Sequence, residues 1–123
     1  MSGNKLFIDT NIAIYLLDGD ESLAGILHQK KIYISFITQL ELLGYSGITK
    51  EEEEQIEIFL QNCTIIDINN QIKTEVIRLR RNYSLKLPDS IVAATSLFLD
   101  IPLFTSDIDF KRMEELNLML YEK

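Results

Sequence analysis

Four acidic residues in this sequence stand directly after apolar runs or inside the first turns of expected helices. They are Asp9, Glu41, Asp89 and Asp107. If the fold brings them to one rim, they cannot all stay ionised without a partner, because mutual repulsion raises some of their pKa values. A hard divalent cation removes that conflict, and carboxylate ligation without His or Cys selects Mg²⁺ or Mn²⁺ over zinc. The chemistry that these residue types suggest is therefore metal-assisted.

Each acid also has a purely structural interpretation. Asp9 and Asp107 are suitable helix N-caps, and Asp89 would favour the positive end of a helix dipole. Glu41 would face solvent from an amphipathic helix, although the leucines within residues 40–43 leave it a narrow polar face. Taken singly, each acid favours the structural interpretation, and the hypothesis of a site depends on all four meeting.

Short strands and helices alternate along the chain and must position these acids. Apolar and β-branched runs predict strands at residues 5–9, 32–35, 64–68, 102–105 and 118–121. Helical spacing and stop signals predict helices within residues 10–17, 21–29, 38–43, 50–62, 70–83, 88–99 and 110–116. Thr38 is the expected N-cap of the third helix, and Thr49 with Glu52 forms a capping box for the fourth.

Strands separated by helices of this length favour right-handed crossovers and a mostly parallel sheet. We therefore predict an α/β fold in three layers, with a central sheet of four to five short strands and helices on both faces. Residues 1–123 show no repeat, linker or change of composition, so one domain is expected. Ligands of such folds bind outside the carboxyl ends of the strands. Asp9 and Asp107 follow strands, Glu41 lies one to two turns into the helix after the second strand, and Asp89 lies in the first turn of a helix. All four can therefore reach one crevice.

Four segments that contain these acids resemble the signature blocks of PIN domains, and most closely those of VapC-type toxin ribonucleases. The segments are Ile8–Asn11, Ser35–Gly44, Pro88–Ala94 and Thr105–Phe110. They occur in the expected order and spacing over nearly the whole chain. A lone Asp-Thr-Asn would be a weak signal, but four ordered blocks are a strong one. The chain is short for the family, which leaves accessory loops in doubt and not the acidic quartet.

The resemblance implies a role for particular residues. It implies that Asp9, Glu41, Asp89 and Asp107 are catalytic and hold one or two Mg²⁺ or Mn²⁺ ions. Asp109 matches a second acid that can share or exchange the role of Asp107. Two polar residues match positions that support the first and fourth acids by hydrogen bonding, and these are Asn11 and Thr105.

The resemblance also implies an activity and partners. The expected reaction is endonucleolytic hydrolysis of single-stranded or looped RNA, which leaves 5′-phosphate and 3′-hydroxyl ends. Metal-bound water would supply the hydroxide, and the cation would neutralise charge on the phosphate. The expected partners are a small basic antitoxin, whose Arg or Lys would enter the carboxylate crevice, and a second copy of the chain in a homodimer. The exposed acids Glu51–Glu54 would speed the encounter with a basic partner.

Basic residues gather between Asn70 and Pro88, where Glu75 is the single acid. Of these, Arg80, Arg81 and Lys86 are the candidates for phosphate contact, because they lie nearest Asp89 in sequence. A solvated helix face explains the cluster equally well. The single histidine, His28, is expected on the surface of the second helix, and the single cysteine, Cys63, is expected to pack rather than to react.

Composition excludes several classes of protein. The chain has 46% hydrophobic and 25% charged residues, which is typical of globular domains and not of disordered or collagen-like chains. One cysteine excludes an internal disulfide. Met1–Lys5 lacks the order of an export signal, and no apolar run approaches the roughly 18 residues of a membrane helix. We therefore expect a cytoplasmic protein. Its net charge of −7 provides no general attraction for nucleic acid.

Three alternatives stay open to different degrees. A phosphorylatable receiver domain would need an acidic pair after the first strand and a Lys after the fourth, and this sequence has neither. A catalytically silent PIN interaction module would be expected to lack at least one acid of the quartet. An RNA-processing PIN nuclease without an antitoxin fits the same residues as a toxin.

Overall fold

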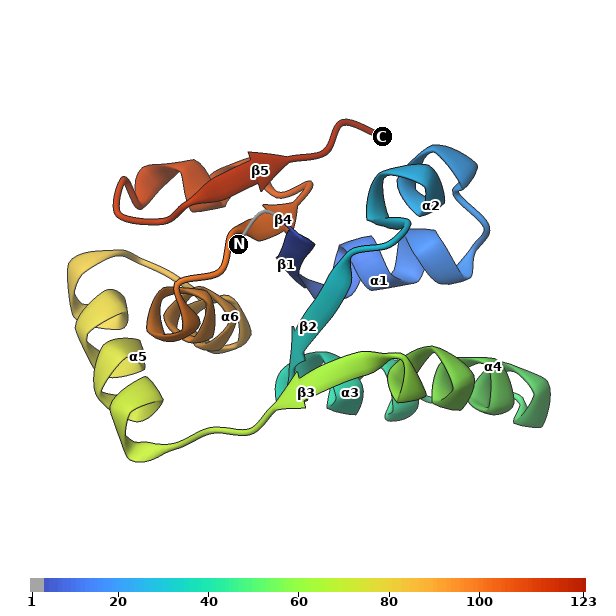
Figure 1. The fold of residues 1–123 in the computed structure, drawn as a ribbon. Coiled ribbons are helices and arrows are strands. Elements are labelled where there is room, and N and C mark those ends of the chain that lie inside the picture. The colour runs from blue at the N-terminus through green and yellow to red at the C-terminus, as the bar shows by residue number, and fades with distance from the viewer. Residues whose placement is uncertain (1–3) are drawn as a thin grey trace.

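The centre of the molecule is a five-stranded parallel sheet with the strand order β3-β2-β1-β4-β5 (Figure 1). A computed structural model describes residues 4–123, and residues 1–3 of the Met1–Lys5 segment lie outside that range. The strands are β1 (Lys5–Ile8), β2 (Lys31–Ser35), β3 (Cys63–Ile66), β4 (Leu103–Thr105) and β5 (Leu118–Leu120). The predicted α/β class and the parallel sheet are confirmed.

Helices lie on both faces of the sheet, as predicted. They are α1 (Thr10–Leu17), α2 (Glu21–Leu27), α3 (Phe36–Leu43), α4 (Lys50–Gln61), α5 (Asn70–Asn82), α6 (Leu87–Leu99) and the 3-10 helix η2 (Ile108–Arg112). Figure 1 shows α5 and α6 on the opposite side of the sheet from α1, α2 and α4. The longest, α5 and α6, have 13 residues each, and within residues 4–123 no helix is both long and apolar enough to cross a bilayer.

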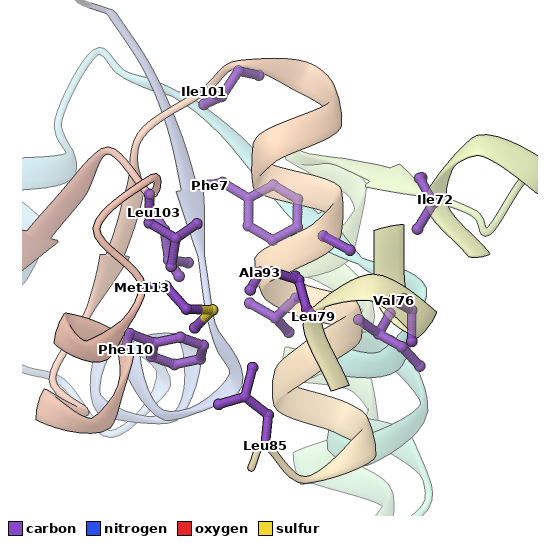
Figure 2. Close-up of a cluster of buried hydrophobic side chains, with 14 residues drawn as sticks. Phe7, Ile72, Val76, Leu79, Leu85, Ala93, Ile101, Leu103, Phe110 and Met113 are labelled. Atoms are coloured by element: carbon purple, nitrogen blue, oxygen red, sulfur yellow. The ribbon is translucent and has the colours of Figure 1, made fainter. Parts of the chain in front are cut away.

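Two apolar clusters hold these layers together. Side chains alternate between the faces of a strand, so Phe7 joins the cluster under α5 and α6 while Leu6 and Ile8 join the cluster under α1, α2 and α4. Strand β4 divides its residues in the same way, with Leu103 in the first cluster and Phe104 in the second. Figure 2 shows the ring of Phe7 beside Ala93 of the central helix α6. Burial of a side chain such as Phe7, which has no exposed surface, contributes about 1.5–3 kcal/mol.

The start of α3 differs from the sequence prediction. Thr38 is not the N-cap, because the helix begins at Phe36 and the hydroxyl of Ser35 accepts the hydrogen bond of the Ile37 N–H at 3.1 Å. Ser35 ends β2, so the strand passes into the helix without a loop. Thr38 then lies inside the first turn and is fully buried. The Thr49–Glu52 capping box of α4 is confirmed, and its two bonds measure 2.9 and 3.1 Å.

The strand order places a ligand site between two particular strands. Starting from β1, the chain builds β2 and β3 on one side and then returns to place β4 on the other. In open parallel sheets, the crevice at such a reversal opens at the carboxyl ends of the two strands. Asp9 follows β1 and Asp107 stands two residues beyond β4, so both carboxylates come to this crevice.

Candidate active site

Asp9 is held in place from two sides. Its carboxylate caps α1 by accepting the N–H of Ile12 at 3.0 Å, and it also accepts the hydroxyl hydrogen of Thr105. The residue is 7% exposed. Burial raises the pKa of Asp9, the two hydrogen bonds oppose that rise, and the nearby charges of Asp107 and Asp89 add to it. The side chain is therefore fixed by the fold in a place that disfavours its charge.

Asp89 enters the same environment from the first turn of α6, directly after Pro88. It is half-buried. Burial raises its pKa, and the carboxylates of Asp107 and Glu41 raise it further, while the ammonium of Lys86 lowers it. These shifts identify the acids as electrostatic neighbours.

Asp107 and its neighbour Asp109 have different positions. The Asp107 carboxylate accepts the N–H of Asp109 at 2.9 Å and so caps η2. The N–H of Asp107 donates to the hydroxyl of Thr105 at 3.0 Å. Asp107 lines the cleft described below, whereas Asp109 is exposed and does not. Asp109 still acts on the site through its charge, which adds to the rise in the pKa of Asp89.

Glu41 lies on α3 and accepts the hydroxyl hydrogen of Thr10 at 2.5 Å. The leucines around it do not confine it as we expected. Leu42 is buried, but Leu40 is 59% exposed, so the polar face at Glu41 is not narrow. The Thr10 bond, rather than an apolar surround, connects Glu41 to the site.

All four acids line one cleft of about 440 Å³, together with Asn11 and Lys86. The cleft presents carboxylate oxygens and neither His nor Cys, which is the donor set that Mg²⁺ or Mn²⁺ prefers. Asp9, Asp89 and Asp107 repel one another, so a cation would relieve that repulsion. Within residues 4–123, no three His, Cys, Asp or Glu side chains are already gathered into a metal-binding group. Mg²⁺ commonly keeps water and substrate phosphate oxygens among its ligands.

The two residues predicted to support the acids both lie beside them. Thr105 is fully buried at the end of β4, and its hydroxyl donates to Asp9 while it accepts the N–H of Asp107. It therefore joins the first and fourth acids. Asn11 lines the cleft from the first turn of α1.

The three basic candidates are separated by the fold. Lys86 lines the cleft, but Arg80 and Arg81 are exposed at the end of α5 and are not among the lining residues. The other arginine of this helix, Arg78, is engaged by Glu75 and Glu115 at 2.6 Å each. Lys86 is therefore the cation of the cluster that the fold brings to the acids.

Two residues named in the sequence analysis lie away from the cleft. His28 is exposed at the end of α2. Cys63 begins β3 and packs against the cluster under α1, α2 and α4. Burial raises the pKa of the Cys63 thiol to about 11, so the thiol is protonated and weakly nucleophilic at neutral pH.

Sequence reasoning missed two features beside the site. One is the pair of hydroxyls of Thr10 and Thr38, which lie 3.0 Å apart next to Glu41. Thr10 follows Asp9 directly, and that position was its one available signal. The other is a groove of about 370 Å³ that shares Ile14 and Glu41 with the cleft. Its remaining walls come from α1, α3, α4 and the turn after α3, through Leu17, Asp18, Leu42, Tyr45, Glu52, Gln55 and Ile56.

Comparison with known proteins finds a matching family and solved structures with the same fold. The family profile of the PIN domain matches residues 6–116. A chain of a toxin–antitoxin complex from Klebsiella pneumoniae is 31% identical with a TM-score of 0.83, and the match covers 96% of this chain and 99% of that one. A chain of VapBC2 from Rickettsia felis, solved on a promoter DNA fragment, is 23% identical with a TM-score of 0.86 and the same coverage.

A third structure, VapBC-1 from nontypeable Haemophilus influenzae, is 23% identical with a TM-score of 0.78 over 94% of this chain and 97% of that one. No curated protein matches the sequence. The profile match covers most of the chain, and chains of VapBC complexes share its fold over nearly their whole length. The resemblance stated from the four sequence blocks is thereby confirmed, and the chain belongs to the PIN-domain family.

Proposed function

We propose that the protein is a Mg²⁺- or Mn²⁺-dependent endoribonuclease and the toxin of a toxin–antitoxin pair. One observation supports the nuclease assignment most directly. Four acids from separate parts of the sequence line a single cleft, and these are Asp9, Glu41, Asp89 and Asp107. Membership of the PIN family supports a nuclease, and an intact quartet argues against a silent interaction module.

The chain's own residues have distinct tasks in this proposal. The four acids would hold one or two cations, with Asp109 as an outer acid beside Asp107. When bound, the cation supplies acidified water and neutralises charge on the phosphate. Asp9 cannot turn away from the cleft, because Ile12 and Thr105 hold its carboxylate. Lys86 would contact a phosphate of the RNA at the rim, and Asn11 would orient polar groups within the cleft.

An RNA cleavage assay tests the enzymatic part. Wild-type protein with Mn²⁺ should cut labelled single-stranded or looped RNA, and EDTA should abolish the cleavage. Asp9→Asn should lower the rate by about 100-fold or more, because it removes a charged ligand. Asp100→Asn is the matched control, since Asp100 is exposed at the opposite end of α6 from Asp89. Its backbone is left-handed (φ 54°), a conformation that Asn tolerates. Wild-type protein that cuts no RNA with either metal would favour the silent module.

The antitoxin part rests on the groove beside the cleft. Its walls combine apolar Ile14, Leu17 and Ile56 with acidic Asp18 and Glu52. A partner segment with apolar side chains and flanking Arg or Lys complements such a surface. Because the groove shares Glu41 with the cleft, a cation from that segment would reach the carboxylates and form charge-assisted hydrogen bonds. The Klebsiella pneumoniae relative comes from a toxin–antitoxin complex, which supports this partner.

Co-expression with the neighbouring upstream reading frame tests the partner. The complex should survive purification and should lose RNA cleavage. Ile56→Glu would place a charge in the apolar wall and should weaken association, while Ile58→Glu alters an exposed residue of α4 outside the groove. If the two proteins do not associate, or if their complex still cuts RNA at the full rate, an RNA-processing nuclease is favoured over a toxin. We also expect a homodimer, and light scattering on the purified protein tests it.

A further inference from the structure

Glu41 differs from the other acids of the cleft in how it is held. Asp9 is buried and Asp89 and Asp107 are half-buried, whereas Glu41 is exposed. A free Glu side chain samples several rotamers, and ordering it costs conformational entropy. The hydroxyl of Thr10, 2.5 Å from its Oε1, restrains that freedom.

The hydrogen bonds among three side chains have a required direction. The hydroxyl of Thr10 donates its single hydrogen to Oε1 of Glu41. The Thr10 oxygen lies 3.0 Å from the Thr38 hydroxyl and therefore accepts from it. The order is Thr38 to Thr10 to Glu41, and hydrogen bonds in such a chain strengthen one another. We name these three residues the hydroxyl relay.

The relay is anchored at its far end. Thr38 is fully buried, and it lies one helical turn before Glu41 on the same helix, α3. Thr10 is the first residue of α1, which Asp9 caps. The relay therefore connects the helix that carries Glu41 to the helix that begins at Asp9.

We propose that Thr10 and Thr38 are positioning residues, which hold the Glu41 carboxylate in the cleft and so tune its binding of the divalent cation. This inference rests on the proposed function in so far as Glu41 is a metal ligand. Removing a residue that orients a metal ligand typically lowers metal affinity or activity by about 10- to 100-fold. Thr10→Val removes the direct bond and should raise the Mn²⁺ concentration for half-saturation by about that amount.

Thr38→Val should act in the same direction with a smaller effect, because Thr10 can still donate to Glu41 without its anchor. Thr38→Ser keeps the hydroxyl and should therefore bind Mn²⁺ with the affinity of wild type. Thr95→Val is the matched control, because Thr95 is also buried in a helix but its hydroxyl donates to the carbonyl of Ile91 at 2.7 Å. In a Glu41→Gln background, Thr38→Val should cause no further loss of Mn²⁺ binding.

Two readouts decide the proposal, and neither depends on cleavage. Mn²⁺ titration by calorimetry measures affinity, and three-bond NMR couplings of Glu41 in metal-free protein show whether its χ1 holds one rotamer. The relay predicts one rotamer in wild type and Thr38→Ser, and averaging in Thr38→Val and Thr10→Val. A Thr10→Val protein with wild-type affinity and a single rotamer would overturn it, as would an equal loss in Thr95→Val. If wild type neither binds Mn²⁺ nor cuts RNA, the proposed function fails, and the NMR couplings still decide whether the relay positions Glu41.

Discussion

At the scale of single residues, the cleft acids carry a conflict between fold and function. Asp9 caps a helix and is held by Thr105, yet burial and its neighbours disfavour its charge. Burial and the charges of Asp107, Glu41 and Asp109 raise the pKa of Asp89, while Lys86 lowers it. The metal-free protein therefore contains repulsion that a bound cation would remove.

Replacing Asp89 with Asn should stabilise the metal-free protein at neutral pH. Because the pKa of Asp89 is raised above its ordinary 3.8, the folded state binds a proton there more readily than the unfolded chain does. The free energy of unfolding therefore falls as the pH rises from the ordinary pKa of Asp89 through its raised pKa in the folded protein. This loss of stability is complete at pH 7. We expect Asp89→Asn to be more stable than wild type at pH 7 in EDTA, with a difference that shrinks toward pH 3. Urea unfolding at both pH values measures it.

Asp100→Asn provides the charge-matched comparison at the other end of α6. An Asp89→Asn variant that is less stable than wild type at pH 7 would contradict the penalty that burial and the neighbouring acids impose on the charge of Asp89.

Lys86 should dominate the contribution of the basic cluster to RNA binding, because it lines the cleft and the arginines do not. Each phosphate contact with a single strand adds about 0.7 to the slope of log affinity against log salt. We expect Lys86→Gln to lower that slope by about 0.7 and to weaken RNA binding. Fluorescence anisotropy measures both, with the Asp9→Asn substitution in every protein and EDTA in the buffer to prevent cleavage. Lys73→Gln, an exposed cation of α5, is the control. Equal effects at both positions would assign binding to general surface charge.

At the scale of elements, the ends of helices decide where the acids point. Strand β2 passes directly into α3 through Ser35, and this sets the rotation that directs Glu41 to the cleft. The same helix ends at Gly44, whose N–H donates to the carbonyl of Leu40 at 2.8 Å. A Cβ at Gly44 would lie 2.5 Å from that carbonyl oxygen, which no real contact permits.

Two glycine substitutions should consequently have opposite effects. Gly44→Ala should destabilise the protein by about 1 kcal/mol or more, because the end of α3 must shift. Gly25 lies inside α2, where an added Cβ meets nothing within 4 Å. Gly25→Ala should therefore stabilise the protein by about 0.5–1 kcal/mol through the better helix propensity of Ala. Thermal unfolding of the two variants tests the pair, and a stable Gly44→Ala would mean that α3 ends differently in solution.

At the scale of the whole molecule, charge matters in two ways. The net charge of −7 opposes RNA in general, so attraction must be local, at the cleft and at Lys86. The same negative charge favours a basic protein partner, and the exposed Glu51–Glu54 at the start of α4 lie next to the groove that Glu52 lines.

Divalent metal should raise the melting temperature of the whole protein. A cation present at ten times its Kd for the folded state stabilises that state by about 1.4 kcal/mol, which is about 4 to 7 °C for a domain of this size. We expect that rise with Mn²⁺ in wild type and its loss in Asp9→Asn. Differential scanning fluorimetry measures it, and Ca²⁺ at the same concentration tests selectivity. A melting temperature that does not change in millimolar Mn²⁺ would contradict a metal site. A weak response to Mg²⁺ without RNA would not, because phosphate oxygens complete its coordination.

The sequence by itself was sufficient for the fold class, the order of the main elements and the candidate quartet. Apolar alternation in β1 and helical spacing in α4 and α5 are local signals, and the four acidic blocks carry the family pattern. The observed ends of several helices and strands differ by a few residues from the predicted ends, where the local signal was ambiguous. The helix at Thr38 is the clearest case, because Ser35 and Thr38 are both acceptable N-caps and only the direct passage from β2 into α3 selects Ser35.

The tertiary structure alone decided how the acids are held and which of their neighbours reach them. It selected Asp107 over Asp109 as the acid that lines the cleft, and Lys86 over Arg80 and Arg81 as the nearby cation. It also joined Thr10, on α1, to Thr38 and Glu41, on α3. The two contacts of Thr10 span 28 and 31 residues of the chain. Spacing along a chain contains no information on how two helices are rotated toward each other.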